Sequence, residues 1–153
     1  MLAQEQADEL RLAVARRFGF SGRSVWWWEE VEAGKSIIVE YGSGQDGLRI
    51  LLTILRGAQQ CLLFITDDDS PPWPCVRATA AYLADMLREQ WFFEYLVVDE
   101  EFTTCVFDTH HNVIIALGDM CTDQSAVGSR AESECLARPC VERLFWSAPD
   151  GYR

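Results

Sequence analysis

Long hydrophobic runs and basic residues are both scarce in this sequence, and each shortage argues against a class of function. No apolar stretch approaches the roughly 20 residues that a membrane-spanning helix requires. Thirteen Lys and Arg residues stand against twenty-four Asp and Glu residues, which gives a formal net charge of −11. Binding to a nucleic-acid backbone needs a basic face, so we expect neither a membrane nor nucleic acid as a partner.

The sequence also lacks the short motifs of common enzymes and metal sites. It contains no Walker loop, no G-x-S-x-G elbow, no H-E-x-x-H pair and no EF-hand pattern. Its six cysteines show no C-x-x-C pair or zinc-ribbon spacing, and we interpret them as small apolar fillers, with Cys61 and Cys105 inside strands. The first ten residues have neither the basic nor the apolar region of a secretory signal, so a cytoplasmic location is expected. We therefore predict a protein without catalytic residues, cofactor or metal.

Aromatic and β-branched residues are concentrated between Trp91 and Asp119. Such residues fit a pleated, half-buried surface, and here they form three short runs: Phe92–Val98, Thr103–Asp108 and Val113–Leu117. The connections between the runs are far shorter than the dozen or so residues that a parallel crossover needs. This stretch therefore predicts an antiparallel three-strand meander.

The rest of the chain supplies helices and further strands. With 153 residues, 49% of them hydrophobic and 24% charged, it is most simply one globular domain over residues 1–153. Hydrophobic periodicity predicts a helix over Leu2–Phe18, a hairpin of Val25–Trp28 with Ser36–Tyr41, a helix capped by Asp46 and closed by Gly57, a strand over Cys61–Thr66, and helices over Cys75–Glu89 and Ala131–Ala137. The expected fold class is α+β: a mainly antiparallel sheet of about five or six strands packed against helices. Val25–Trp28 is its candidate edge.

The segment Gly42–Gly47 matches the pattern G-x-G-x-x-G. It follows a predicted strand and precedes a predicted helix, and Asp67–Asp69 lie about twenty residues further on, as in dinucleotide-binding proteins. An alternative function is therefore a small-ligand or nucleotide/S-adenosylmethionine-binding protein that uses this loop. The meander does not continue a βαβ series, however, and we favour the simpler interpretation of a Gly-Ser loop that ends in a helix cap.

A second candidate site is the turn that contains Asp108, His110, His111 and Asn112. Imidazole and carboxylate groups suit a metal or general acid–base chemistry. The two histidines are adjacent, so in an extended segment their side chains diverge, and no third ligand has a recognisable spacing. We therefore expect a structural turn in which a histidine hydrogen-bonds to nearby backbone. Carboxylates are stabilised near the positive end of a helix dipole. We therefore expect Asp67–Asp69 to be solvated carboxylates near the start of a helix.

An excess of acid together with many aromatic residues favours a protein that binds another protein. Carboxylates steer the approach of a basic partner, and large aromatic side chains anchor it. The sequence thus predicts a non-enzymatic acidic protein-binding module with a basic protein partner. A further alternative is a homo-oligomeric structural protein whose exposed tryptophans form its own interface. The candidate contact residues are Trp26, Trp27, Trp28, Glu29, Glu30, Asp67, Asp68, Asp69 and Trp73.

Two segments resemble a small, little-characterised family of bacterial cytosolic proteins with a pattern of the kind PPWP…EYxxV…HHN. The matching residues, within about residues 60–118, are Leu63–Asp67, Pro72-Trp73-Pro74, Phe93-Glu94-Tyr95, Val97-Val98-Asp99, Phe102, Asp108–Asn112 and Gly118. Members of this family look similar in size and acidity to immunity proteins of bacterial polymorphic toxin systems. The resemblance thus implies a toxin as the partner. It implies no catalytic residues, and it does not include Gly42–Gly47.

Overall fold

The computed structural model describes residues 1–21, 26–32, 34–66, 71–89 and 94–118. All of these residues belong to one compact unit that spans Met1–Asp123. The helix predicted over Ala131–Ala137 lies outside the described residues, and so do Asp67, Asp68 and Asp69. The prediction of one domain over residues 1–153 therefore reaches beyond the part of the chain that is described.

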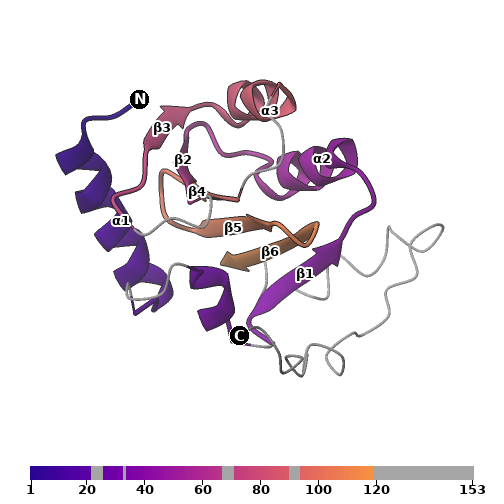
Figure 1. Cartoon of the computed structure of the whole chain (residues 1–153), viewed down its shortest axis with the longest axis horizontal. Helices are drawn as coiled ribbons and strands as arrows, with labels where there is room; N and C mark the ends of the chain where they lie inside the picture. The colour runs from indigo at the N-terminus through magenta and orange to yellow at the C-terminus, as the bar shows by residue number, and fades with distance from the viewer. Residues whose placement is uncertain (22–25, 33, 67–70, 90–93, 119–153) are drawn as a thin grey trace, which may run out of the picture. The chain divides into compact units, whose positions relative to one another are not determined.

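The described part of the chain contains a six-stranded sheet in which every neighbouring pair is antiparallel (Figure 1). The spatial order of the strands is β1-β6-β5-β4-β2-β3. Their bounds are Ser36–Glu40 for β1, Cys61–Ile65 for β2, Cys75–Ala78 for β3, Tyr95–Asp99 for β4, Thr104–Thr109 for β5 and Val113–Gly118 for β6. Together with the helices, this sheet confirms the predicted α+β class, and β4, β5 and β6 are the predicted meander.

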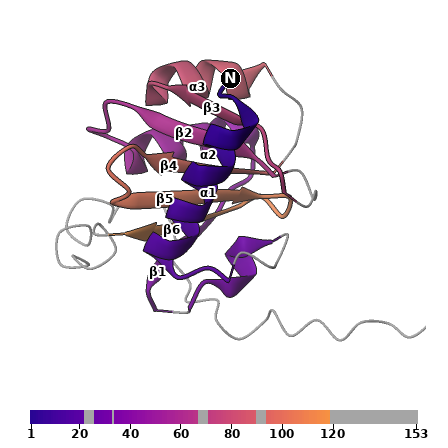
Figure 2. The same ribbon diagram turned by 90° about the vertical axis from the view of Figure 1, so that its left-hand side faces the viewer.

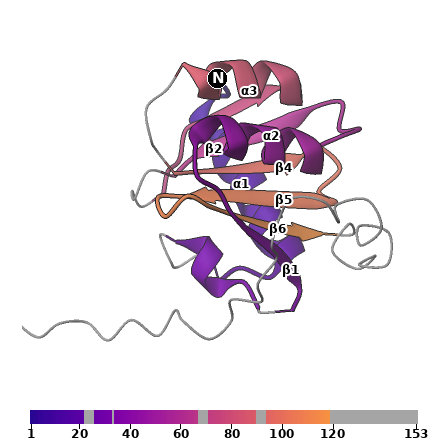
Figure 3. The ribbon, with the colours of Figure 1, turned by 90° about the vertical axis from the view of Figure 1, so that its right-hand side faces the viewer.

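Helices cover both faces of the sheet. Helix α1, Gln4–Phe18, lies across one face (Figure 2), and helices α2, Gly44–Ile54, and α3, Ala80–Arg88, lie on the other (Figure 3). Two hydrophobic clusters result, one shared by the sheet with α1 and one shared with α2 and α3. Because both faces are buried, β4 is buried at every position and shows no alternation of polar and apolar residues.

The helices begin and end at recognisable signals. Ala7 and Val14 are buried on the apolar face of α1, and Gly19, with a positive φ of 82°, ends the helix as predicted. The N-cap of α2 is Ser43, whose hydroxyl accepts the backbone N–H of Asp46, so the prediction that Asp46 is the cap was wrong. Thr79 caps α3 in the same way.

The predicted hairpin of Val25–Trp28 with Ser36–Tyr41 is wrong. Residues Trp27–Glu30 form a short 3₁₀-helix, η1, and β1 pairs with β6 instead. Three consecutive tryptophans on a strand would place at least one large ring on each face, whereas one tight turn buries Trp27 alone.

The predicted helix over Cys75–Glu89 was too long. Its first four residues are strand β3, which pairs with β2, and the helix begins only after Thr79. The apolar stripe was nevertheless correct: Val76, Ala80, Leu83 and Leu87 all contact one hydrophobic cluster. Val76 lies on the face of β3 that packs against the same cluster as α3, so its position reproduced a helical spacing.

Gly118 is required by the close pairing of β6 with β5. Its φ is 129°, which an L-residue with a side chain rarely adopts, and an added Cβ would collide with the carbonyl oxygen of Thr103. We predict that Gly118→Ala lowers the free energy of unfolding by about 2–4 kcal/mol, because strain and a backbone collision add together. Urea denaturation followed by tryptophan fluorescence measures the loss.

Gly57→Ala is the matched control for this prediction. Gly57 also has a positive φ, 102°, but an added Cβ would meet nothing within 4 Å. Only the conformational cost remains there, about 1–2 kcal/mol. Equal losses in the two variants would contradict the role assigned to the contact with Thr103.

Candidate functional site

Two segments that are far apart in the sequence meet at the surface of the described structure. Trp28, from η1, lies against the β5–β6 turn, with its ring centroid 6.2 Å from that of His110 and 6.0 Å from that of His111. Trp26 extends this group, with its ring centroid 6.4 Å from that of Trp28. With the two carboxylates of η1 these residues form what we call the aromatic–acidic patch: Trp26, Trp28, Glu29, Glu30, His110 and His111.

The 3₁₀ turn decides which tryptophans belong to the patch. Trp26 is 38% exposed and Trp28 is half-buried, but Trp27 and Trp73 are each only 1% exposed. The Trp27 ring lies between Phe20, at 5.1 Å, and Trp73, at 4.9 Å, in the cluster beneath α1. Trp27 and Trp73 are therefore core residues and offer no surface to a partner, contrary to their place among the predicted contacts.

The carboxylates of the patch differ in their freedom. Glu30 accepts the backbone N–H of Ser21 at 2.6 Å and its hydroxyl at 2.8 Å, which ties η1 to the segment that follows α1. Glu29 is exposed. Glu29 is thus the carboxylate that is best placed to meet another molecule, and Glu30 holds the loop.

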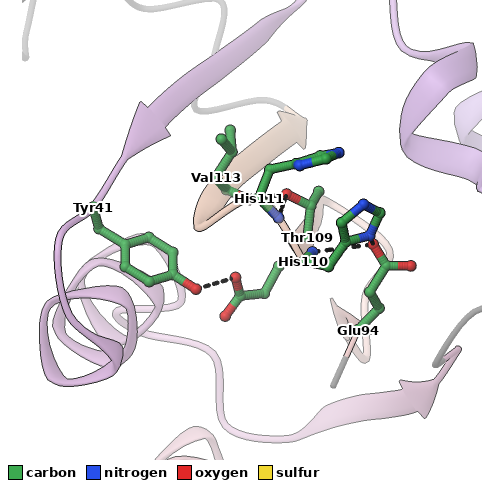
Figure 4. A network of polar contacts seen from close by, with 7 residues as sticks. Tyr41, Glu94, Thr109, His110, His111 and Val113 are labelled. Atoms are coloured by element: carbon green, nitrogen blue, oxygen red, sulfur yellow. Dashed lines mark hydrogen bonds and ion pairs between the residues drawn. The ribbon is translucent and has the colours of Figure 1, made fainter. Parts of the chain in front are cut away.

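A buried carboxylate fixes the histidine turn from below. Glu94 is only 3% exposed, and its Oε1 lies 2.6 Å from Nδ1 of His110 and accepts the backbone N–H of His110 at 3.1 Å (Figure 4). The hydroxyl of Thr109 donates to the carbonyl of Val113 across the same turn. The His110 ring is therefore held by a side-chain carboxylate, not by nearby backbone as predicted.

The two histidine rings do not diverge. Their centroids are 3.8 Å apart, because residues 110–112 form a tight turn in which Asn112 has a positive φ of 57°. The expectation of divergence assumed an extended segment and was wrong. Among the described residues no group of three or more His, Cys, Asp or Glu side chains is placed to hold a metal ion.

Asp108 was predicted to belong to the site of the histidine turn, but its side chain makes a different contact. It accepts one hydrogen bond from the hydroxyl of Tyr41 and one from that of Tyr95, each at 2.6 Å. Burial raises the pKa of Asp108, and the two hydroxyl donors partly oppose the rise. The contact links the segment before α2 to strands β4 and β5, so its role is structural.

The Gly42–Gly47 loop also has a structural role in this arrangement. Ser43 caps α2, and a Cβ added to Gly47 would lie 2.9 Å from Cζ of Tyr41, so this glycine lets the Tyr41 ring pack against the helix. Among the described strands, the preceding strand β1 pairs with β6 alone and in the antiparallel sense, unlike the parallel strands around a dinucleotide-binding loop. Asp67 lies outside the described residues.

The three described cysteines carry no reactive thiol. Cys61, Cys75 and Cys105 are buried in strands without a disulfide partner. Burial raises the pKa of Cys61 to about 11 and that of Cys75 to about 12, so both stay protonated at neutral pH. The prediction that Cys61 and Cys105 are apolar fillers inside strands is confirmed.

Sequence reasoning missed Glu94, Tyr41 and Tyr95 as residues that shape this region. Glu94 had one visible signal: it is a charged residue inside the apolar run Phe92–Val98, and a charged residue in a buried strand is expected to need a partner. The pairing of Tyr41 and Tyr95 with Asp108 had none, since it depends on the spatial order of three strands.

Comparisons with protein-family models, with curated proteins and with solved structures found no match for this chain. In the described residues, none of the helices has the length and apolar character needed to cross a membrane. The function must therefore be argued from the geometry of the chain itself.

The Tyr41–Asp108 contact predicts a pH-dependent contribution to stability. The folded-state pKa of Asp108 lies above the ordinary value of 3.8, so folding is favoured most when this carboxyl is protonated, and that advantage is lost as the pH rises through the raised pKa. Tyr41→Phe removes a donor to the charged form. At a pH above the raised pKa of Asp108, this substitution should lower the free energy of unfolding by about 1.5–3 kcal/mol, and at a pH below that pKa it should lower it clearly less.

Urea unfolding of both proteins from acidic to mildly alkaline pH measures this difference. Tyr82→Phe serves as the control, because Tyr82 is 59% exposed on α3 and no hydrogen bond of its hydroxyl is seen among the described residues. A loss in Tyr41→Phe that is the same at every pH would show that the hydroxyl does not act through the charge of Asp108.

Proposed function

We propose that this protein is a non-enzymatic, acidic protein-binding module of the immunity type, which neutralises a bacterial toxin by covering a basic surface on it. The observation that carries the proposal is the aromatic–acidic patch. Two segments that the sequence alone marked for separate reasons, the tryptophan-rich segment and the histidine turn, contribute to one exposed surface.

The patch has the chemistry of a protein-binding surface. Partly exposed Trp and His rings supply contact area at a small cost in conformational entropy, and Trp is among the residues most often found at the energetic centre of interfaces. Its rigidity supports the same use, because Glu94 fixes His110 and Glu30 fixes η1 before any partner arrives.

Charge supports a basic partner. The chain carries a formal net charge of −11, so a basic protein is attracted over a distance and most other acidic proteins are repelled. At the patch itself, Glu29 is exposed beside rings whose faces attract cations. An arginine or lysine of the partner is the side chain that this combination fits best.

The test begins with the genomic neighbour. Immunity proteins of this kind are expected beside a gene for a large secreted protein with a variable C-terminal toxin domain, and that domain is the partner to purify. We predict saturable binding by calorimetry and loss of the toxin's activity in the complex. Trp26→Ala combined with Glu29→Lys should weaken binding by at least about 100-fold, since it removes an anchor and reverses a charge.

Tyr82→Ala is the matched control, because it removes an exposed aromatic ring of similar size from α3. It should leave the affinity unchanged. Equal weakening by both variants, or no binding to the neighbouring toxin domain, would contradict the proposal. Saturable binding of NAD or S-adenosylmethionine that is abolished by Gly44→Trp would favour the nucleotide-binding alternative instead.

A further inference from the structure

The outer edge of β1 differs from the opposite edge of the sheet. At the opposite edge, the backbone N–H of Leu2 donates to the carbonyl of Cys75, so the chain before α1 covers part of β3. Strand β1 is the last strand on its side, and among the described residues nothing pairs with its outer edge. An uncovered edge strand offers a row of backbone donors and acceptors to another strand.

The direction of these backbone groups follows from the pairing of β1 with β6. The N–H of Tyr41 donates to the carbonyl of Asn112 at 3.0 Å, next to the pair Glu40↔Val113. In an antiparallel ladder the direction alternates from one residue to the next. The backbone N–H and C=O groups that point toward β6 therefore belong to Tyr41, Val39 and Ile37. The backbone groups that point away from the sheet belong to Ser36, Ile38 and Glu40.

An apolar side chain lies at the middle of this edge. Ile38 is 58% exposed, although its neighbour across the β1–β6 pair, Ile115, belongs to the core cluster beneath α1. Natural edge strands are commonly protected by a charged residue or a proline at such a central position. Here the charged residues are Lys35, just before the strand, and Glu40, its last residue, so the centre of the strand is apolar.

We infer that β1 is a self-pairing edge, through which two copies of this chain associate about a two-fold axis. If Ile38 lies opposite its own copy, Ser36 lies opposite Glu40, and each of the three residues faces its partner with its free backbone groups. About six hydrogen bonds between copies result. The side chains agree with this register, because Ile38 meets Ile38 and no charged residue lies opposite one of like sign.

This register explains why a second copy fits better than an arbitrary strand. Isologous pairing needs a strand that complements itself when it is reversed, and the five residues Ser36–Glu40 do so around Ile38. On the other face of the sheet the same register places Ile37 opposite Val39, which is again an apolar pair. The interface is small, so we expect a dissociation constant in the micromolar range.

Reversed charges at position 38 test the two-fold register directly. In Ile38→Lys two ammonium groups would face each other, and in Ile38→Glu two carboxylates would do so. We predict that the full-length parent protein is dimeric at high micromolar concentration by light scattering and that each variant is monomeric. An equimolar mixture of the two variants should form a dimer again, because unlike charges then lie opposite each other.

Tyr82→Lys is the control, since Tyr82 is 59% exposed and Ile38 58%, but Tyr82 lies on α3. It should leave the dimer intact. A monomeric parent protein would overturn the inference, and protection of its Ile38 amide from hydrogen exchange would then show that its own chain covers the edge. Charged variants that remain dimeric would also overturn it. So would a mixture of the two variants that stays monomeric.

A second variant decides the question if a charged variant does not fold. In a hydrogen-bonded antiparallel pair, which Ile38 would form with Ile38 of the second copy, the two Cα atoms lie about 5.5 Å apart, and this separation falls within the range of a disulfide. In a background in which Cys121, Cys135 and Cys140, which lie outside the described residues, are replaced by serine, Ile38→Cys should therefore form a covalent dimer under mild oxidation, whereas the background protein should not. Failure to cross-link while the variant is folded would overturn the inference.

Discussion

Burial of both faces of the sheet is the constraint on which the rest of this structure depends. Strands β2 and β4 are apolar along almost their whole length, and here helices on both sides remove both faces of these strands from water. Helix α1 covers one face, and α2 with α3 covers the other. Within the described sheet, polar residues consequently lie at strand ends, in turns and on the edge strands, and these are the places where the candidate site and the outer edge of β1 lie.

Buried carboxylates at strand ends show how this constraint is met. Asp99 at the end of β4 accepts the hydroxyl of Thr103 and the backbone N–H of Thr104, and Glu94 before β4 accepts the backbone N–H of His110 and lies 2.6 Å from its Nδ1. A buried carboxylate without donors would cost several kcal/mol, so each one fixes the backbone that supplies its partners. The shape of the histidine turn is thus a consequence of satisfying Glu94 inside an apolar sheet.

The sequence predicted those features that local pattern determines. The meander and α1 follow from apolar runs between turns and from helical spacing. Strand β3 was missed because Val76 continued the spacing of α3 from a different element. The meeting of Trp28 with His110 was not predictable, since no local pattern specifies which distant turn a 3₁₀ segment will contact.

The edge strand and the patch are parts of one continuous piece of structure. Tyr41, immediately after β1, hydrogen-bonds through its N–H to Asn112 in the histidine turn and through its hydroxyl to Asp108. A strand that pairs with β1 would therefore brace the same turn that carries the patch. Two chains joined at β1 would also display two patches related by a two-fold axis. That arrangement would not change the affinity of one patch for a monomeric partner, but it would raise the avidity for a dimeric partner or for two epitopes on one chain, provided that their spacing matched.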